Sequence, residues 1–308
     1  MSINDTYFSS TILHISPKKA LIQTISNIVY AQKSTLDYEN VPLYMDIWRP
    51  KGVSQLPVVL FVTGGGFIAS NRARLPQLRM FLAEAGYCVS TISYRVTPES
   101  IFPAPIEDVK SAIRYLKAHS NELNINPDKI SVVGDSAGGY LASFVGVTNG
   151  ITEFDKGDNL YVSSSIQAAV NLYGPTDLSK KAEGLSDEIK TQYASAASTT
   201  SLFINGIPGF NIKNFDSSSD ELMRRANPIN YIHEKSAPML LMHGEKDQVV
   251  SPNQTDILYQ ALRRKGIEAY RYIIPEAGHA SHIGSHWIQD EVLNVILDFL
   301  DKMQLEKI

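Results

Sequence analysis

The stretch that decides the fold is KISVVGDSAGGYLASFVGV, residues 129–147, which predicts a strand, a sharp turn and a helix. Residues 130–133 are a short, largely β-branched run, as expected for a strand that is buried on both faces. The next five residues, 134–138, match the G-x-S-x-G elbow around Ser136. Gly134 and Gly138 fit this turn because side chains at their positions would collide. The turn would expose the Ser136 hydroxyl at the edge of a sheet, where the first N–H groups of the helix can stabilise an oxyanion.

Apolar runs alternate with helical patterns along most of the 308-residue chain. We expect strands at 28–32, 41–48, 56–62, 87–94, 130–133, 166–173, 238–243 and 269–274, and helices at 18–28, 76–85, 106–119, 187–194, 253–265 and 286–303, besides the helix that starts at Ala137. The alternation within 41–48 is typical of an antiparallel edge strand. This order predicts an α/β fold with a mostly parallel central sheet flanked by helices.

One long segment, residues 176–233, interrupts the alternation, and much of it is rich in Ser, Thr, Asn and Gly. A segment of this length without regular periodicity inside an α/β unit is usually a lid or a cap. An unstructured surface insertion is the alternative, but the large apolar residues scattered through the segment favour a cap. We therefore expect a single domain over residues 1–308 with a small cap insertion at about 176–233.

The composition is that of an ordinary globular protein, with 44% hydrophobic and 19% charged residues. The net charge is −4 and no dense Lys/Arg cluster is present, so we expect neither nucleic acid nor an anionic membrane as a partner. No apolar run reaches the length of a membrane span, and the polar N-terminal residues differ from a signal peptide, so we expect a cytoplasmic protein. The single cysteine, Cys88, is interpreted as a small core residue. The oligomeric state is left undetermined by the sequence.

An acid and a base follow the elbow in the order that acyl transfer on such a sheet requires. Asp247 comes just after the strand predicted over 238–243, and His279 comes just after the strand predicted over 269–274. The carboxyl ends of parallel strands meet at one edge of a sheet, so these loops would gather around Ser136. A nucleophilic serine needs a base for its proton and an anion that orients the base, in the chain order Ser, Asp, His.

Two other interpretations of these loops stay open. Glu245 is an alternative acid, although it would emerge very soon after its strand. His279, His282 and His286 have helix-like spacing and could bind a metal, but they lack a carboxylate partner pattern. We expect no metal and no other cofactor. His243, at the end of a predicted strand, is interpreted as a structural residue.

A glycine loop supplies the remaining part of an oxyanion site. Residues 63–67, Thr-Gly-Gly-Gly-Phe, follow the apolar strand predicted over 56–62. Backbone without side chains lets two N–H groups of this loop point into the site beside that of Ala137. A phosphate-binding loop is a poor alternative, since the G-x-G-x-x-G spacing and a Walker lysine are both missing.

Taken together, these motifs resemble the α/β-hydrolase superfamily, specifically the hormone-sensitive-lipase-like esterases. They are similar to the subgroup of acetylxylan and feruloyl esterases and kynurenine formamidases. The matching stretches are residues 57–67, 92–105 (ISYRVTPESIFPAP), 126–142, 171–177 (NLYGPTD), 226–229 (ANPI), 243–252 and 278–279. They extend over most of the chain.

The resemblance implies a role for each residue that matches a family motif. It implies Ser136 as nucleophile, Asp247 as acid, His279 as base, and the N–H groups of Gly65, Gly66 and Ala137 as oxyanion donors. This chain departs from the family at one point, because Thr63 stands where the family usually has the histidine of His-Gly-Gly-Gly. That histidine normally braces the oxyanion loop, so we expect the loop to be held differently here.

The function expected from these residues is that of a serine carboxylesterase that works through an acyl-enzyme. A small-molecule ester with a short acyl chain is the expected substrate, because the predicted cap offers little continuous apolar surface for a long chain. A formamide or amide hydrolase with the same residues is an alternative. A non-catalytic ligand receptor on the same fold is another, but all three triad residues are present.

Overall fold

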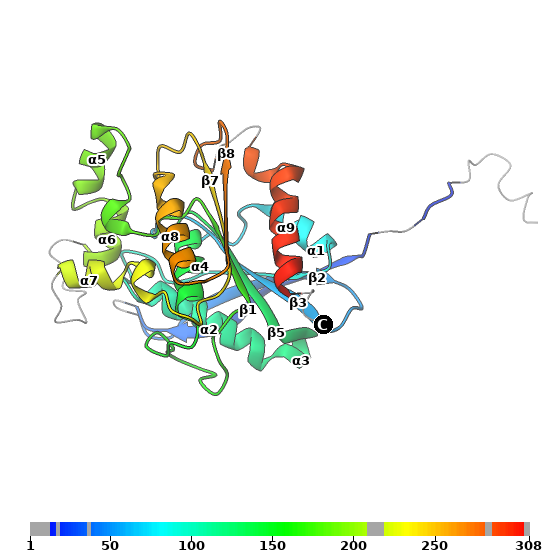
Figure 1. Ribbon diagram of the computed structural model, residues 1–308. Coiled ribbons are helices and arrows are strands. Elements are labelled where there is room, and N and C mark those ends of the chain that lie inside the picture. Colours follow the sequence, from blue (N-terminus) through cyan, green and yellow to red (C-terminus); the bar gives the residue numbers. More distant parts are fainter. Residues whose placement is uncertain (1–12, 17–18, 36–37, 208–218, 281–284, 305–308) are drawn as a thin grey trace, which may run out of the picture.

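An eight-stranded sheet with the strand order β1-β2-β4-β3-β5-β6-β7-β8 runs through the computed structural model (Figure 1). The structure describes residues 13–16, 19–35, 38–207, 219–280 and 285–304. The strands are β1 Ile22–Lys33, β2 Val41–Pro50, β3 Leu56–Val62, β4 Cys88–Ile92, β5 Ile125–Asp135, β6 Ala168–Leu172, β7 Met239–Gly244 and β8 Ala269–Ile274. β1 pairs with β2 and β2 with β4 in antiparallel fashion, and the remaining pairs are parallel. The expected mostly parallel α/β sheet is confirmed.

Helices connect the parallel strands and cover both faces of the sheet. They are α1 Pro76–Glu84, α2 Ala104–Ala118, α3 Ser120–Leu123, α4 Ala137–Val147, α5 Asp187–Ala194, α6 Thr199–Asn205, α7 Ser219–Arg225, α8 Asn253–Arg264 and α9 Asp290–Gln304. Short 3₁₀ helices are also present in the described chain, namely η2 Leu178–Lys180, η3 Pro228–Tyr231 and η4 His286–Ile288. The expected helix over 286–303 is therefore divided, with a 3₁₀ turn before α9. Among the helices of the described ranges, none combines the length and the apolar character that a membrane crossing needs.

The expected N-terminal helix over 18–28 is wrong, because residues 22–28 belong to β1, while Lys18 lies outside the described residues. Ile22, Ile25 and Ile28 are spaced by three, which imitates one face of a helix. In the structure, register shifts interrupt the pairing of β1 with β2 between Ile25 and Ile28 and again after Val29. Such bulges break the alternation of a regular strand. The β-branched residues of the segment favour the strand that forms.

The expected edge position of residues 41–48 is also wrong. β2 is antiparallel to both of its neighbours, as the alternation predicts, but β1 lies outside it and forms the edge. The alternation reflects burial on one side of β2, where Met45 and Ile47 are fully buried.

The core consists of two layers, one on each face of the sheet. Along β3, Val58, Leu60 and Val62 pack in the layer that contains α2, α4 and α8. Val59 and Phe61 point the other way, into the layer that contains α1 and α9. All five side chains are fully buried, which explains why this strand is a continuous apolar run. The sheet is thus held rigidly enough to present its carboxyl-end loops at fixed positions.

The segment between β6 and β7 carries α5, α6 and α7, which lie together at one side of the molecule (Figure 1). Serine side chains at Ser186 and Ser198 accept hydrogen bonds from the first turns of α5 and α6 and so define where these helices begin. Phe203 of α6 is fully buried and stacks on Phe67 with a ring separation of 4.1 Å. Its carbonyl also accepts a hydrogen bond of 2.9 Å from the N–H of Phe102. These contacts fix the described part of the insertion next to the glycine loop after β3.

Candidate active site

Ser136 forms the turn between β5 and α4. Its backbone has φ 52° and ψ −119°, a conformation that is strained for any residue with a side chain. The neighbouring positions have no room for side chains, because a Cβ on Gly134 would collide with the backbone of Gly138, and one on Gly138 with the backbone of Val62. The strand, elbow and helix expected from the sequence are therefore all present.

Two hydrogen bonds connect the three side chains that the sequence singles out. His279 Nε2 lies 2.9 Å from Ser136 Oγ, and His279 Nδ1 lies 2.7 Å from Asp247 Oδ2. Asp247 follows β7 and His279 follows β8, so both come from carboxyl-end loops of parallel strands. A carboxylate only accepts, so Nδ1 carries the ring proton and Nε2 can accept the proton of the Ser136 hydroxyl. This arrangement is suited to general-base activation of the serine.

The Asp247 carboxylate is fully buried and hydrogen-bonded at both oxygens. Oδ1 accepts from the N–H groups of Val249 and Val250 at 2.8 and 2.9 Å, and Oδ2 contacts His243 and His279. Burial alone would raise the pKa of Asp247, but the hydrogen bonds from His243, His279 and Val250 outweigh it and hold the pKa below its usual range. The carboxyl group is thus ionised at neutral pH, as a partner of the His279 ring must be.

His243 has a role beside Asp247 that its position in the sequence did not indicate. It is fully buried, and its Nε2 lies 3.1 Å from Asp247 Oδ2 and 2.9 Å from the carbonyl oxygen of Val250. Both neighbours are acceptors, so Nε2 donates and helps to orient the carboxylate. The interpretation of His243 as a structural residue is compatible with this contact. The only hint in the sequence of the contact between His243 and Asp247 is their separation by four residues.

The other interpretations of these loops find less support. Glu245 is exposed and accepts a hydrogen bond from the backbone N–H of Glu276, so Asp247 is the carboxylate that reaches His279. His286 lies in η4, and His282 lies outside the described residues. No group of three or more potential metal ligands occurs within the ranges that the structure describes.

Gly65, Gly66 and Ala137, the expected oxyanion donors, line the same cavity as Ser136. Gly65 and Gly66 lie in the loop after β3, and within the described chain their N–H groups donate no hydrogen bond. Ala137 is the first residue of α4, where an N–H has no acceptor inside the helix. Gly66 has φ 62°, and a Cβ on Gly65 would collide with the backbone of Ala69. The loop therefore requires glycine at both positions.

The glycine loop is held by Asp135 in place of the histidine that Thr63 replaces. The Thr63 side chain is fully buried, and its Oγ1 has no hydrogen-bond partner in the described structure. The buried carboxylate of Asp135 accepts from the N–H of Gly64 at 2.7 Å, and Arg74 Nη2 pairs with its other oxygen at 2.9 Å. Tyr94 adds a hydrogen bond from its hydroxyl to the carbonyl of Thr63. The loop is thus held differently from that of the family, through the carboxylate of Asp135 and the hydroxyl of Tyr94.

Aromatic residues support the His279 ring from the side. The ring of Tyr173 is fully buried and meets the His279 ring edge-on at 4.8 Å. Trp287 packs on Tyr173 at 4.3 Å, and its Nε1 donates to the carbonyl of Gly278. These contacts restrict the movement of the loop that carries His279.

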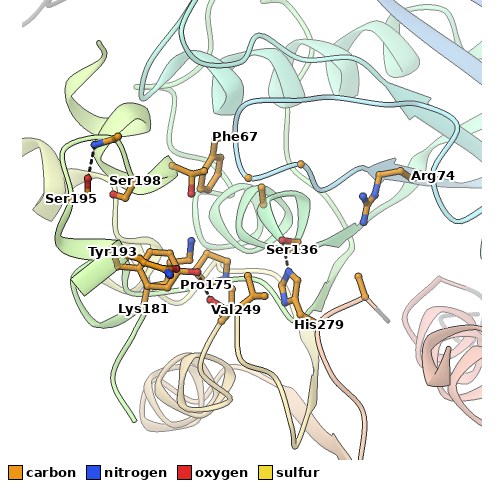
Figure 2. A pocket seen from close by; sticks show the side chains of 18 residues that line it. Phe67, Arg74, Ser136, Pro175, Lys181, Tyr193, Ser195, Ser198, Val249 and His279 are labelled. Carbon is orange, nitrogen blue, oxygen red and sulfur yellow. Dashed lines mark hydrogen bonds between the residues drawn. The ribbon is translucent and has the colours of Figure 1, made fainter. Parts of the chain in front are cut away.

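The residues around Ser136 enclose a cavity of about 650 Å³ (Figure 2). Figure 2 shows the hydrogen bond between Ser136 and His279 at its floor, with Arg74 and Lys181 on opposite sides. The wall on the glycine-loop side includes Gly65, Gly66 and Phe67, and the β6–β7 insertion supplies Lys181, Gln192, Tyr193, Ser195, Ala197, Ser198 and Thr199. The cavity is large enough for a small ester with its alcohol group.

Known structures identify the class of fold. A truncated carbohydrate esterase from gut microbiota matches with a TM-score of 0.75 and 26% identity, over 92% of this chain and 97% of that chain. A thermophilic esterase from Thermogutta terrifontis with bound propionate matches with a TM-score of 0.68 and 22% identity, over 92% of this chain and 94% of that chain. The protein therefore has the α/β-hydrolase fold.

The family follows from the sequence. Residues 45–262 match the BD-FAE family model, and the chain belongs to this family. Esterase LipQ of Mycobacterium tuberculosis is 29% identical over 280 residues, which cover 88% of this chain and 62% of LipQ. These relatives confirm the resemblance to hormone-sensitive-lipase-like esterases. The matches cover 62%, 53% and 60% of the Mycobacterium tuberculosis relatives LipQ, LipM and LipC, so this chain spans about half to three fifths of their length.

Proposed function

We propose that this protein is a serine carboxylesterase that cleaves short-chain esters of small molecules through an acyl-enzyme. The observation that carries the proposal is the hydrogen-bonded series Asp247–His279–Ser136 at the floor of a cavity. Relatives named esterases in the same family support it. The site needs no metal or other cofactor for this chemistry.

Each residue has a defined role in the proposed reaction. Ser136 Oγ attacks the ester carbonyl while His279 Nε2 takes its proton, and Asp247 stabilises the resulting imidazolium. The tetrahedral oxyanion accepts hydrogen bonds from the N–H groups of Gly65, Gly66 and Ala137. His279 then gives its proton to the leaving alcohol. Water, activated by the same ring, hydrolyses the acyl-enzyme and returns Ser136 to its starting state.

The β6–β7 insertion, residues 176–233, acts in this proposal as a cap on a single α/β-hydrolase domain. Its described residues form one wall of the cavity, and Phe203 stacks on Phe67 beside the glycine loop. Many of the lining residues that it contributes are polar, among them Ser195, Ser198 and Thr199. A cytoplasmic location stays a prediction from the sequence.

The preference for a short acyl chain follows from the character of this wall. Each buried methylene contributes about 0.8 kcal/mol, so a long chain gains affinity only along a continuous apolar groove. The polar wall interrupts such a groove. We therefore expect acetyl to butyryl esters to be cleaved with higher kcat/KM than long-chain esters.

The test measures kcat/KM for p-nitrophenyl esters from acetyl to palmitoyl, with N-formylkynurenine alongside. Ser136→Ala and His279→Ala should each lower kcat by about 10⁴-fold or more, as loss of a triad member does elsewhere. The matched control is His286→Ala, which should retain most of the activity. Preference for the palmitoyl ester would refute the small-cavity argument, and turnover of the formamide above every ester would favour a formamide hydrolase.

A further inference from the structure

Lys181 places a buried positive charge on the wall of the cavity that contains Ser136. It follows η2 in the β6–β7 insertion, and only 7% of its surface is exposed. Its carbonyl accepts a hydrogen bond from the N–H of Ser251, which ties this part of the insertion to the loop after Asp247. This hydrogen bond holds the backbone of Lys181 beside that loop.

The ammonium group of Lys181 has an incomplete set of partners. Its Nζ lies 4.3 Å from the centre of the Tyr193 ring, so one side of the charge is covered by an aromatic face. No hydrogen bond or ion pair is made by this ammonium among the residues that the structure describes. Burial lowers the pKa of Lys181 to about 8, while the charge of Asp247 acts in the opposite direction at longer range.

A second buried lysine, Lys110, has an ammonium group whose partners are all supplied by the protein, as expected for a structural residue. Lys110 is fully buried, and its Nζ donates to the carbonyls of Thr148 and Ile151 and to Ser164 Oγ. Its three N–H donors are thus satisfied inside the protein. The N–H donors of Lys181 find no acceptor in the described part of the chain, and its side chain lines a cavity that is open to a ligand. Burying a charge without partners costs free energy, so the buried position of the Lys181 ammonium indicates a bound molecule that supplies them.

The charges on the cavity wall point to the nature of the ligand. Among the described residues that line this cavity, the side chains that can carry a positive charge are Arg74, Lys181 and His279, and none is an aspartate or a glutamate. The charge of Arg74 is matched by its ion pair with Asp135. Of the lysine and arginine charges among the described lining residues, that of Lys181 is left for a bound molecule.

We propose that Lys181 binds an ionised carboxylate of the substrate, so that the preferred esters are those that carry a carboxylate besides the ester to be cleaved. This inference rests on the proposed esterase function and names its substrate class. An ammonium donates charge-assisted hydrogen bonds to a carboxylate, and such bonds are strong where water is partly excluded. The carboxylate belongs either to the acyl part, as in a half-ester of a dicarboxylic acid, or to the alcohol part.

Two pairs of esters of nearly equal shape distinguish these sources. Monoethyl succinate and ethyl succinamate differ only in carrying a carboxylate or an amide on the acyl part. The compounds 3-acetoxybenzoate and 3-acetoxybenzamide differ in the same way on the alcohol part. In one of the two pairs, we expect kcat/KM to be about tenfold to a hundredfold higher for the anion than for the amide, as for one charge-assisted hydrogen bond. A wild-type protein that hydrolyses the neutral esters but favours the anion in neither pair overturns the proposal.

Variants at two adjacent lysines then assign the preference to Lys181. Lys181→Met should abolish the preference for the anion, and Lys181→Arg should retain most of it. Lys180→Met is the matched control, because Lys180 is exposed and does not line this cavity, and it should leave the ratio unchanged. The assignment is overturned if the ratio of kcat/KM for the anion to that for the amide stays high in Lys181→Met, or falls equally in Lys180→Met.

The pH dependence gives a readout that a purely structural lysine would not move. The titratable groups that face the Lys181 ammonium are Asp247 and Tyr193. The preference for the anion should decline as pH rises through about 8, where this lysine loses its proton, and Lys181→Arg should keep it. A constant ratio from pH 7 to 9 in the wild type contradicts the proposal. Failure to hydrolyse any of the four esters in a Ser136-dependent way would instead overturn the esterase function itself.

Discussion

Asp135 is expected to hold the glycine loop in the geometry that stabilises the oxyanion, and its replacement by alanine tests this directly. The substitution removes the acceptor for the N–H of Gly64 and the partner of Arg74. Gly64 precedes Gly65 and Gly66, which line the cavity and are the proposed oxyanion donors. Any displacement of its backbone therefore moves the proposed donors relative to Ser136.

The size of the effect follows from the two contacts that are lost. A hydrogen bond to a charged group contributes about 1.5–3 kcal/mol, and the Gly64 N–H would be left buried without a partner. The Arg74 side chain is 36% exposed, so solvent screens the lost ion pair, which adds less than about 1 kcal/mol. We expect the free energy of unfolding to fall by about 2–4 kcal/mol. Because the donors act on the transition state, kcat should fall by about 10- to 100-fold with a smaller change in KM.

The assay is steady-state hydrolysis of p-nitrophenyl acetate together with thermal unfolding, and Thr63→Val is the matched control. Valine has the shape of threonine and removes a buried hydroxyl for which the described residues offer no hydrogen-bond partner. This variant should be at least as stable as the wild type, with kcat within about twofold, since an unsatisfied buried hydroxyl costs about 1–3 kcal/mol. The reverse outcome, with Asp135→Ala active and Thr63→Val impaired, would refute the bracing role of Asp135.

Two further predictions concern Asp247 and the β6–β7 insertion. Asp247→Asn should lower kcat by about 10⁴-fold. Because the folded-state pKa of Asp247 lies below its usual range, its contribution to stability should be complete above about pH 4 and decline as pH falls further. If the difference in unfolding free energy between wild type and variant does not change with pH, the assignment is contradicted. Phe203→Ala should lower the unfolding free energy by about 3–5 kcal/mol and weaken the preference among acyl lengths, because Phe203 packs the insertion against Phe67. Phe299→Ala removes a buried ring on the other face of the sheet, in the layer of α1 and α9, and should reduce stability alone. Equal selectivity in both variants would argue against a role of the insertion in substrate choice.

Local patterns predicted much of the fold and of the candidate site. The elbow around Ser136 depends on glycines that are close in the sequence, so its motif was readable directly. Asp247 and His279 were predictable because both follow apolar strands whose carboxyl ends must meet in a parallel sheet. The run over 56–62 was assigned with the bounds that β3 has, since burial on both faces leaves an unbroken apolar stretch.

The features that the sequence did not predict depend on contacts between distant segments. The pairing of Asp135 with Gly64 and Arg74 joins positions that are 71 and 61 residues apart. The bulges of β1 became visible only with its partner strand in place. Lys181 lies in an insertion without periodicity, so no pattern placed its side chain on the cavity wall.

Labelling by a fluorophosphonate probe tests most directly the proposal that Ser136 is the nucleophile. The elbow and the hydrogen bond to His279 predict that the probe modifies Ser136 alone, at a rate that falls sharply in His279→Ala. Peptide mass analysis of the labelled protein identifies the modified residue. Loss of all labelling in Ser136→Ala is the predicted result, and labelling that persists in this variant would contradict the assignment.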